Sequence, residues 1–194
     1  MDTAEDYAKG DSEKQLGEVL KSLTPEARAA VVIGSKILPN NCMNVAEHVD
    51  GTLARLGVDC IDLYMVHWPI DANSMAHFAG GHASFGEAIT TVNNDEVPPN
   101  EQAFRDLLAA QASGKIKHIG CSNFGVAQLK EVMALGVTVA VNELCYSLIF
   151  RAIEFEIAPF CKENDIQVLC YSPLQQGILT NRSLNCADDV PVYR

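Results

Sequence analysis

The chain has 194 residues, of which 48% are hydrophobic and 20% are charged, a composition typical of a single globular domain. Its net charge of −11 argues against nucleic acid or an anionic membrane as the main partner. No apolar run approaches the roughly 18 residues of a membrane span, and no secretory signal opens the chain. The seven cysteines are dispersed, without a C-x-x-C pair. We therefore expect reduced, buried thiols and a cytoplasmic protein, while an organellar targeting segment upstream of Met1 stays open.

Short apolar segments alternate with amphipathic segments along the chain, which predicts strands alternating with helices. The predicted strands are Val31–Ile37, Ile61–Pro69, Ile116–Phe124, Thr138–Tyr146 and Ile166–Leu174. The predicted helices are Ser12–Leu23, Met43–Leu56, Asn100–Ser113, Val126–Leu135 and Ala152–Asn164. Because the strands lack polar alternation, we expect a parallel sheet that is covered on both faces. The order of elements predicts βαβ units with right-handed crossovers.

One interval departs from this regular spacing. Ile70–Pro99 has no periodicity and contains paired glycines, asparagines and prolines, so we predict a loop insertion at about residues 70–99 within a single domain covering residues 1–194. In a barrel this loop would lie on the face where active sites are built. Its His77 and His82 are expected to be solvated. No metal site is predicted, because no third ligand has a useful spacing.

Tyr7, Lys36 and His67 each lie at or just beyond the end of a predicted strand. Singly, they would be interpreted as a surface tyrosine, a snorkelling lysine and a packing histidine. Together they favour a proton donor for a carbonyl, because a phenol needs a nearby cation to act near neutral pH. A lysine facing the interior must be paired, and Asp2 on the adjacent strand is the expected partner.

The motifs also resemble those of a known family. Six segments occur in an order and approximate spacing that resemble those of aldo-keto reductases. They are DTAEDY, VVIGSKI, RLGVDCIDLYMVHWP, GKIKHIGCSNFG, VNELCYSLIFRAIE and CYSPLQQGILT. The resemblance covers essentially the whole chain. It implies a (β/α)8 TIM-type barrel that binds NADP(H) across its carboxyl-terminal face and transfers hydride to an aldehyde or ketone. A glycine-rich Rossmann fingerprint is absent, and the family does not use one.

The resemblance assigns roles to individual residues. It implies that Tyr7 is the general acid and base, with Asp2, Lys36 and His67 as its tuning and orienting partners. The implied cofactor-binding residues are Asp2, Ser122, Asn123, Glu143, Tyr171, Ser172, Leu174 and Gln176. Among them, Ser122 and Asn123 would hold the nicotinamide carboxamide, and Tyr171 would stack on its ring.

Position 143 departs from the family pattern, which commonly has glutamine there. A carboxylate is less suited to holding a carboxamide if it is buried. We therefore expect Glu143 to be partly solvated, protonated, or paired with the carboxamide NH2.

Compared with the family, the first and last βα units are missing, and about five complete strands are expected. The favoured interpretation is a fragment of a longer enzyme. The alternative is a catalytically inactive truncated isoform or remnant, which would act, if at all, as a binding module for another protein. The carbonyl substrate, the choice between NADPH and NADH and the oligomeric state stay open.

Overall fold

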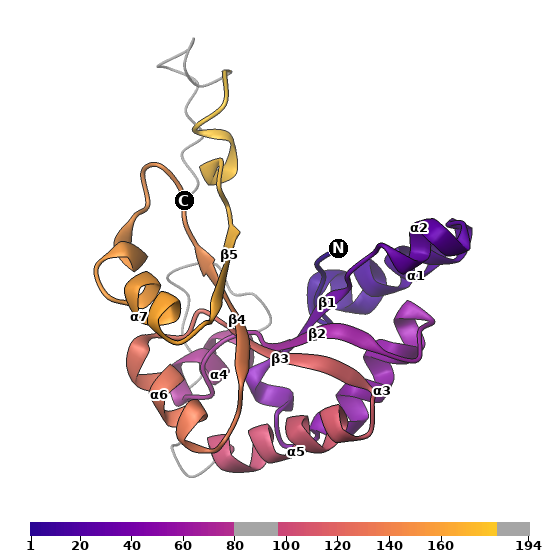
Figure 1. The fold of residues 1–194 in the computed structure, drawn as a ribbon, viewed down its shortest axis with the longest axis horizontal. Coiled ribbons are helices and arrows are strands. Elements are labelled where there is room, and N and C mark those ends of the chain that lie inside the picture. Colours follow the sequence, from indigo (N-terminus) through magenta and orange to yellow (C-terminus); the bar gives the residue numbers. More distant parts are fainter. Residues whose placement is uncertain (80–96, 182–194) are drawn as a thin grey trace.

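The computed structural model describes residues 1–79 and 97–181. Its centre is a parallel five-stranded sheet in which the strands are neighbours in chain order (Figure 1). The strands are β1 (Gly34–Ile37), β2 (Ile61–Val66), β3 (Ile116–Ser122), β4 (Val139–Cys145) and β5 (Gln167–Tyr171). This is the predicted arrangement of five parallel strands.

Helices cover the convex side of the curved sheet (Figure 1). The longer ones are α1 (Asp11–Ser22), α3 (Val45–Leu56), α5 (Asn100–Ala112) and α6 (Val126–Ala134). The shorter ones are α2 (Pro25–Ala29), α4 (Ala72–Ala79) and α7 (Ile157–Glu163), with 3-10 turns η1 (Tyr7–Gly10), η2 (Pro39–Asn41), η4 (Ala152–Glu154) and η5 (Gln175–Gly177). The buried apolar side chains of these helices pack on the strands, as in one layer of a barrel.

The parallel pairing brings the carboxyl ends of all five strands to one edge. Lys36 pairs with Met65 in the β1–β2 register, and Ser122 pairs with Glu143 in the β3–β4 register. Asp2 precedes β1 in sequence and forms an isolated parallel bridge with Gly34, so the N-terminus adds a short extended segment beside β1. Polar residues that are distant in sequence therefore meet at one end of the sheet.

A buried carboxylate fixes α1 against α3 and β1. Glu13 is fully buried; its Oε1 accepts a hydrogen bond from Ser35 Oγ at 2.6 Å, and its Oε2 accepts one from Arg55 Nε at 2.5 Å. A buried charge is tolerated when it is paired and hydrogen-bonded in this way. The network holds the helix that follows Tyr7 in a fixed position relative to the sheet.

Several expected elements differ from the structure in their extent. The first strand begins at Gly34 and not at Val31, and helix α1 begins at Asp11, after a left-handed Gly10, and not at Ser12. The single helix expected over Ala152–Asn164 is split into η4 and α7. The short helix α2 was not predicted, although Thr24 caps it and proline occupies its first position.

The predicted loop at 70–99 contains a helix, α4, so the prediction of an irregular segment is wrong for residues 72–79. The helix is too short to show periodicity. Tertiary contacts stabilise it, because Met75 is buried and its carbonyl accepts a hydrogen bond from Asn40 Nδ2 at 2.9 Å. A local hydrogen bond from Ser74 N to Asp71 Oδ1 at 2.8 Å adds to them at the start of the helix. Residues 80–96, which include the predicted His82, lie outside the described residues.

Strand β5 contradicts the expectation that both faces of every strand are covered. Its residues are exposed or half-buried, and Leu169 is 41% exposed. The physical reason is its position: within the described residues, β5 pairs with β4 alone. Cys170 is therefore exposed, although a buried thiol was expected, and the six described cysteines are free.

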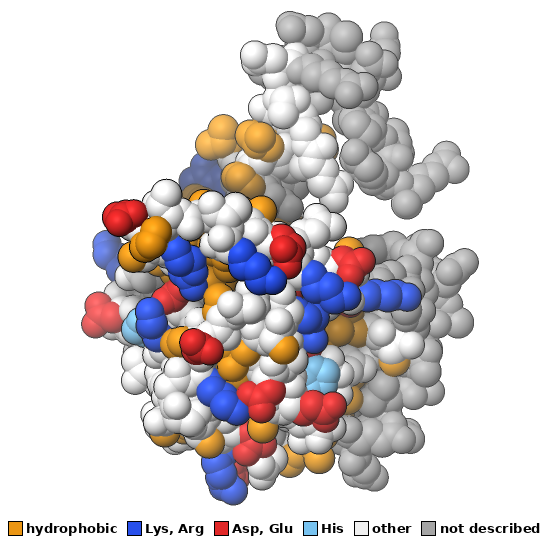
Figure 2. Space-filling view, turned by 90° about the vertical axis from the view of Figure 1, so that its right-hand side faces the viewer, with side chains coloured by type: hydrophobic (Ala, Val, Ile, Leu, Met, Phe, Trp, Pro, Cys, Tyr) orange, Lys and Arg blue, Asp and Glu red, His pale blue; other side chains and the backbone are white. Residues whose placement is uncertain are grey.

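The surface shows mixed charge. Figure 2 views the side that carries α1 and α2, where basic and acidic side chains are interspersed over the described part of the face. In residues 1–79 and 97–181, no helix combines the length and apolar character of a membrane-spanning segment.

Two glycines in adjacent helices offer a matched stability test. A Cβ at Gly17 in α1 would lie 2.7 Å from the Leu56 carbonyl oxygen, a backbone atom, whereas one at Gly51 in α3 would lie 2.9 Å from Arg55 Nη1, a side-chain atom. We predict that Gly17→Ala destabilises the fold by about 1–3 kcal/mol through overpacking. Gly51→Ala should cost less, because a side-chain nitrogen can shift further than a backbone carbonyl and alanine favours the helix by up to about 1 kcal/mol. Urea unfolding followed by circular dichroism measures both, and equal effects would contradict this interpretation.

Candidate active site

The side chain of Lys36 is the centre of the site. It is fully buried, and its Nζ donates hydrogen bonds to Asp2 Oδ2 at 2.6 Å, to the Thr3 carbonyl at 3.0 Å and to Tyr7 Oη at 3.4 Å. The predicted pairing with Asp2 is confirmed. Burial disfavours the ammonium, but the hydrogen bond and charge of Asp2, together with the charge of Glu143, outweigh it and raise the pKa of Lys36. The lysine therefore stays charged.

Tyr7 lies in η1, beyond the segment that pairs with β1. Tyr7 is 39% exposed, its ring centroid is 5.0 Å from Lys36 Nζ, and its ring meets the His67 ring edge-on with centroids 5.5 Å apart. Burial, together with the charges of Asp2 and Glu143, raises the pKa of Tyr7 although Lys36 lowers it. The phenol therefore keeps its proton near neutral pH and has an open side toward solvent. A cation beside the hydroxyl was predicted, whereas the net upward shift was not.

The turn after Tyr7 has an unusual backbone. Ala8 and Lys9 have φ values of 50° and 55°, followed by Gly10 at 86°. Left-handed conformations cost L-residues of order 1–3 kcal/mol and cluster at functional sites. Asn123 and Ser172, which follow β3 and β5, share this conformation with φ values of 64° and 53°.

Glu5 anchors the segment that carries Tyr7, a role that the sequence analysis missed. Its Oε1 accepts hydrogen bonds from Leu38 N at 2.9 Å and from Asn41 Nδ2 at 2.8 Å, and its Oε2 lies 2.6 Å from His48 Nδ1. The carboxylate thus ties the N-terminal segment to η2 and α3. Glu5 stands between Asp2 and Asp6 in the sequence, so no local signal distinguishes it from its acidic neighbours.

His67 follows β2 and is buried and neutral. Its pKa is lowered to about 3 by burial and by the charge of Lys36, and Nδ1 has no hydrogen-bond partner. Its ring stacks on Phe78 of α4 with centroids 6.4 Å apart, and Phe78 also lies 6.1 Å from Trp68. Phe78 belongs to the segment that was expected to be a loop, so its contact with His67 was not predicted.

Ser122 and Asn123 form one hydrogen-bonded unit at the end of β3. Asn123 Nδ2 donates to the His67 carbonyl at 3.1 Å and to Ser122 Oγ at 3.0 Å. Its Oδ1 accepts from Tyr171 Oη at 2.8 Å, which links β3 to the end of β5. The backbone N–H of Asn123 donates to the Glu143 carbonyl at 2.9 Å. The three residues predicted to hold nicotinamide are therefore brought together.

Asn142 supports this unit from β4 and was not identified from the sequence. It is fully buried, and its Nδ2 donates to the Phe124 carbonyl at 2.9 Å while its Oδ1 accepts from Phe124 N at 3.4 Å. A polar residue inside an apolar strand was the available signal, because such a residue requires buried partners.

Glu143 differs most from its expectation. Its side chain is 6% exposed, so the expected partial solvation is wrong, and its Oε2 lies 3.4 Å from Lys36 Nζ. The curvature of the sheet brings β1 and β4 close enough for this contact, which strand order alone would not predict. Burial and the charge of Asp2 raise the pKa of Glu143 although Lys36 lowers it, and Oε2 has no hydrogen-bond partner.

The remaining predicted residues lie beyond β5. Ser172 is half-buried, whereas Leu174 and Gln176 are exposed in and around η5. Leu174 is 55% exposed, and Gln176 has a φ of 53°. Their place on the carboxyl-terminal side of the sheet agrees with the expectation, while their predicted contacts with pyrophosphate stay predictions.

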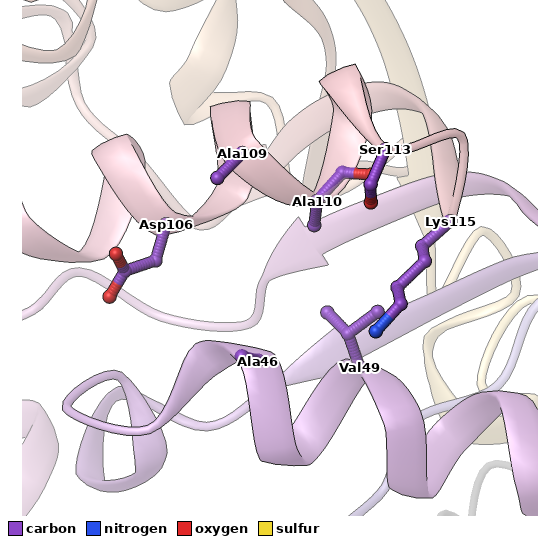
Figure 3. A pocket seen from close by; sticks show the side chains of 7 residues that line it. All are labelled: Ala46, Val49, Asp106, Ala109, Ala110, Ser113 and Lys115. Carbon is purple, nitrogen blue, oxygen red and sulfur yellow. The ribbon is translucent and has the colours of Figure 1, made fainter.

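A cavity of about 660 Å³ opens beside this cluster, lined in part by Trp68, Asn123, Cys145 and Tyr171. Its size suits a small ligand or part of a cofactor. A second pocket, of about 220 Å³, lies between α3 and α5, and Figure 3 shows its small side chains facing one another across the two helices. It belongs to the outer helical layer, apart from the polar edge of the sheet. Within the described ranges, no group of three or more potential ligands is arranged for a metal ion.

A curved parallel sheet, with helices outside and polar residues at its carboxyl edge, is the architecture of part of a (β/α)8 barrel enzyme. The aldo/keto reductase family model matches residues 1–191. The chain belongs to the aldo-keto reductase family.

Known relatives and structures agree with this assignment. The methylglyoxal reductase YeaE of Escherichia coli is 32% identical over 95% of this chain and 58% of the relative, and an NADH-specific methylglyoxal reductase of the same organism is 30% identical over 93% and 53%. An aldo/keto reductase from Klebsiella pneumoniae in complex with NADP and acetate matches 93% of this chain and 55% of its own, with 27% identity and a TM-score of 0.72. The thermostable aldo-keto reductase Tm1743 matches 95% and 58%, with 26% identity and a TM-score of 0.74. The chain thus spans about half the length of these proteins.

The buried His67 predicts a specific pH dependence of stability. The unfolded chain binds a proton at this residue near pH 6.5, whereas the native state does so only near pH 3. Between these values the unfolded state binds more protons, so stability falls as the pH is lowered. We expect His67 to contribute a loss of about 1 kcal/mol between pH 7.5 and 5.5.

Urea unfolding at the two pH values measures this loss, and His67→Gln should reduce it. Histidine-selective NMR provides the control: the His67 ring signals should not titrate between pH 8 and 5. A midpoint inside that range would show that the ring is not held neutral.

Proposed function

We propose that this protein reduces aldehyde or ketone carbonyls to alcohols with NADP(H), and that Tyr7 is the general acid. The observation that carries the proposal is the contact of the Tyr7 hydroxyl with the buried Lys36 ammonium at 3.4 Å, while Lys36 is held by Asp2 at 2.6 Å. A half-exposed phenol on a buried cation can give a proton to a bound oxygen, because the cation stabilises the phenolate that remains.

The nicotinamide group, when bound, would supply the hydride that attacks the carbonyl carbon. The chain itself would supply the proton: Tyr7 donates to the developing alkoxide, and Lys36 stabilises the resulting negative charge. Neutral His67, adjacent to the Tyr7 ring, can orient the carbonyl oxygen with its ring without adding a second positive charge. Trp68 and Phe78 would exclude water from this side of the substrate.

The residues around Asn123 fit a nicotinamide group. A carboxamide has both donor and acceptor edges, and Ser122 and Asn123 provide matching groups. The buried Oε2 of Glu143 lacks a hydrogen-bond donor, and a carboxamide NH2 is a donor of the required kind. Tyr171 provides an aromatic ring for stacking. Ser172, Leu174 and Gln176 would follow the pyrophosphate along the edge beyond β5.

Two of the relatives described above are methylglyoxal reductases, which suggests small dicarbonyls such as methylglyoxal as first substrates to test. One of them is NADH-specific, while a yeast relative, 31% identical over 90% of this chain and 49% of its own, is an NADPH-dependent alpha-keto amide reductase. Assays should therefore include both coenzymes. The alternative, a catalytically inactive binding module, predicts no aldehyde-dependent coenzyme oxidation with either one.

We predict that Tyr7→Phe abolishes carbonyl reduction and leaves coenzyme binding within a few-fold. Phenylalanine keeps the ring and removes only the hydroxyl, and general acid catalysis typically contributes roughly 10²–10⁴ in rate. Coenzyme absorbance with methylglyoxal measures kcat, and coenzyme fluorescence measures binding. A variant that keeps more than about half of the parent kcat would exclude Tyr7 as the acid.

Lys36 should act through its charge. We predict that Lys36→Met lowers kcat strongly and that the residual activity peaks at higher pH, because loss of the cation raises the pKa of Tyr7. Lys14→Met is the matched control, since Lys14 is an exposed partner of Asp11 in α1. An unchanged pH–rate profile in the Lys36 variant would show that the charge of Lys36 does not tune the pKa of Tyr7.

A further inference from the structure

Four oxygen atoms surround the Lys36 ammonium, which has only three hydrogens to donate. Three of the oxygens, from Asp2, the Thr3 carbonyl and Tyr7, accept hydrogen bonds. The fourth, Glu143 Oε2, lies at 3.4 Å, the same distance as Tyr7 Oη, but accepts none. A buried carboxylate oxygen without a donor is costly and unusual in a native protein.

We propose that Glu143 is a second counter-ion of Lys36 that competes with the Tyr7 hydroxyl for the third hydrogen of the ammonium. Glu143 is then a positioning residue, because it acts on Tyr7 through Lys36. The proposal rests on the proposed function, in which Tyr7 is the acid, and it is independent of any contact between Glu143 and coenzyme.

The competition has a definite direction. When Lys36 donates to Tyr7, the phenolate is favoured; when it turns to Glu143, Tyr7 loses that donor and faces an additional negative charge. Both effects favour the protonated phenol, in line with the contribution of Glu143 to the raised pKa of Tyr7. Glu143 thus keeps Tyr7 protonated, and able to act as an acid, to higher pH. It disfavours the phenolate that alcohol oxidation would need.

Other charges around the cluster do not reproduce this role. Asp2 is the direct partner of Lys36 at 2.6 Å and occupies one hydrogen. His67 is neutral in the pH range in which a tyrosine titrates. From β5, Tyr171 also lies near the cluster, and burial raises its pKa, so it is uncharged at neutral pH. Glu143 is therefore the added charge that can be removed selectively.

The test is a direct titration of Tyr7 in the purified chain. Tyrosine labelled with ¹³C at Cζ reports ionisation, and Tyr7→Phe assigns the signal. Glu143→Gln should lower the midpoint of Tyr7 by roughly one pH unit, the effect of one nearby charge. Glu143→Asp, which keeps the charge, should stay closer to the parent. Glu163→Gln, at an exposed position of α7, should leave the midpoint unchanged.

An unchanged or higher Tyr7 midpoint in Glu143→Gln would overturn the proposal, as would equal shifts in Glu143→Gln and Glu143→Asp. If Glu143→Gln does not fold, as judged by circular dichroism, Glu143→Asp decides alone: a Tyr7 midpoint within about half a unit of the parent supports the proposal, and a larger downward shift overturns it. In the active protein, the alkaline limb of the reduction profile should move by the same amount as the midpoint. The NMR result does not depend on turnover, so a failure of the proposed function would appear separately, as full activity in Tyr7→Phe.

Discussion

The burial of one ammonium group dominates this site. Lys36 has no exposed side-chain surface, and an unpaired charge in such a place would cost several kcal/mol. Its presence therefore requires acceptors from other segments, and these come from the N-terminal extended segment and from η1, while a carboxylate of β4 lies 3.4 Å away as a second counter-ion. The position of Tyr7 follows from this requirement, since its hydroxyl is one of the acceptors. The contacts that satisfy the buried Lys36 ammonium therefore also hold the hydroxyl of the proposed acid in place.

The curved sheet makes this arrangement possible. In a flat sheet, β1 and β4 would be separated by two strands, and Lys36 would not reach Glu143. Curvature brings their inward-facing side chains together, while the hydrogen bonds of Asn123 join the ends of β2, β3 and β5. The helices α1 and α3, joined through Glu13 and Arg55, hold the outer layer behind the strand that carries Lys36.

The sequence predicted the strands and the pairing of Lys36 with Asp2, because apolar runs and buried charges have strong local signatures. It did not predict the Lys36–Glu143 contact, which depends on how far the sheet curves. It also missed Phe78, because a helix of one or two turns shows no periodicity and is stabilised by contacts such as that of Asn40 with Met75. In the part of the chain that the structure describes, β5 pairs with β4 alone. The composition of β5 did not indicate its exposure, because the number of neighbouring strands leaves no mark in a strand's own residues.

The left-handed backbone at Ala8 and Lys9 has a consequence for sequence variation. Both side chains are exposed, and by contact alone these positions would tolerate almost any residue. Their φ values of 50° and 55° instead disfavour β-branched residues, and glycine, asparagine or aspartate would relieve the strain. The residues next to Tyr7 are therefore restricted by the path of the main chain and not by neighbouring atoms. Natural variation at positions 8 and 9 should therefore be narrower than the exposure of these side chains suggests.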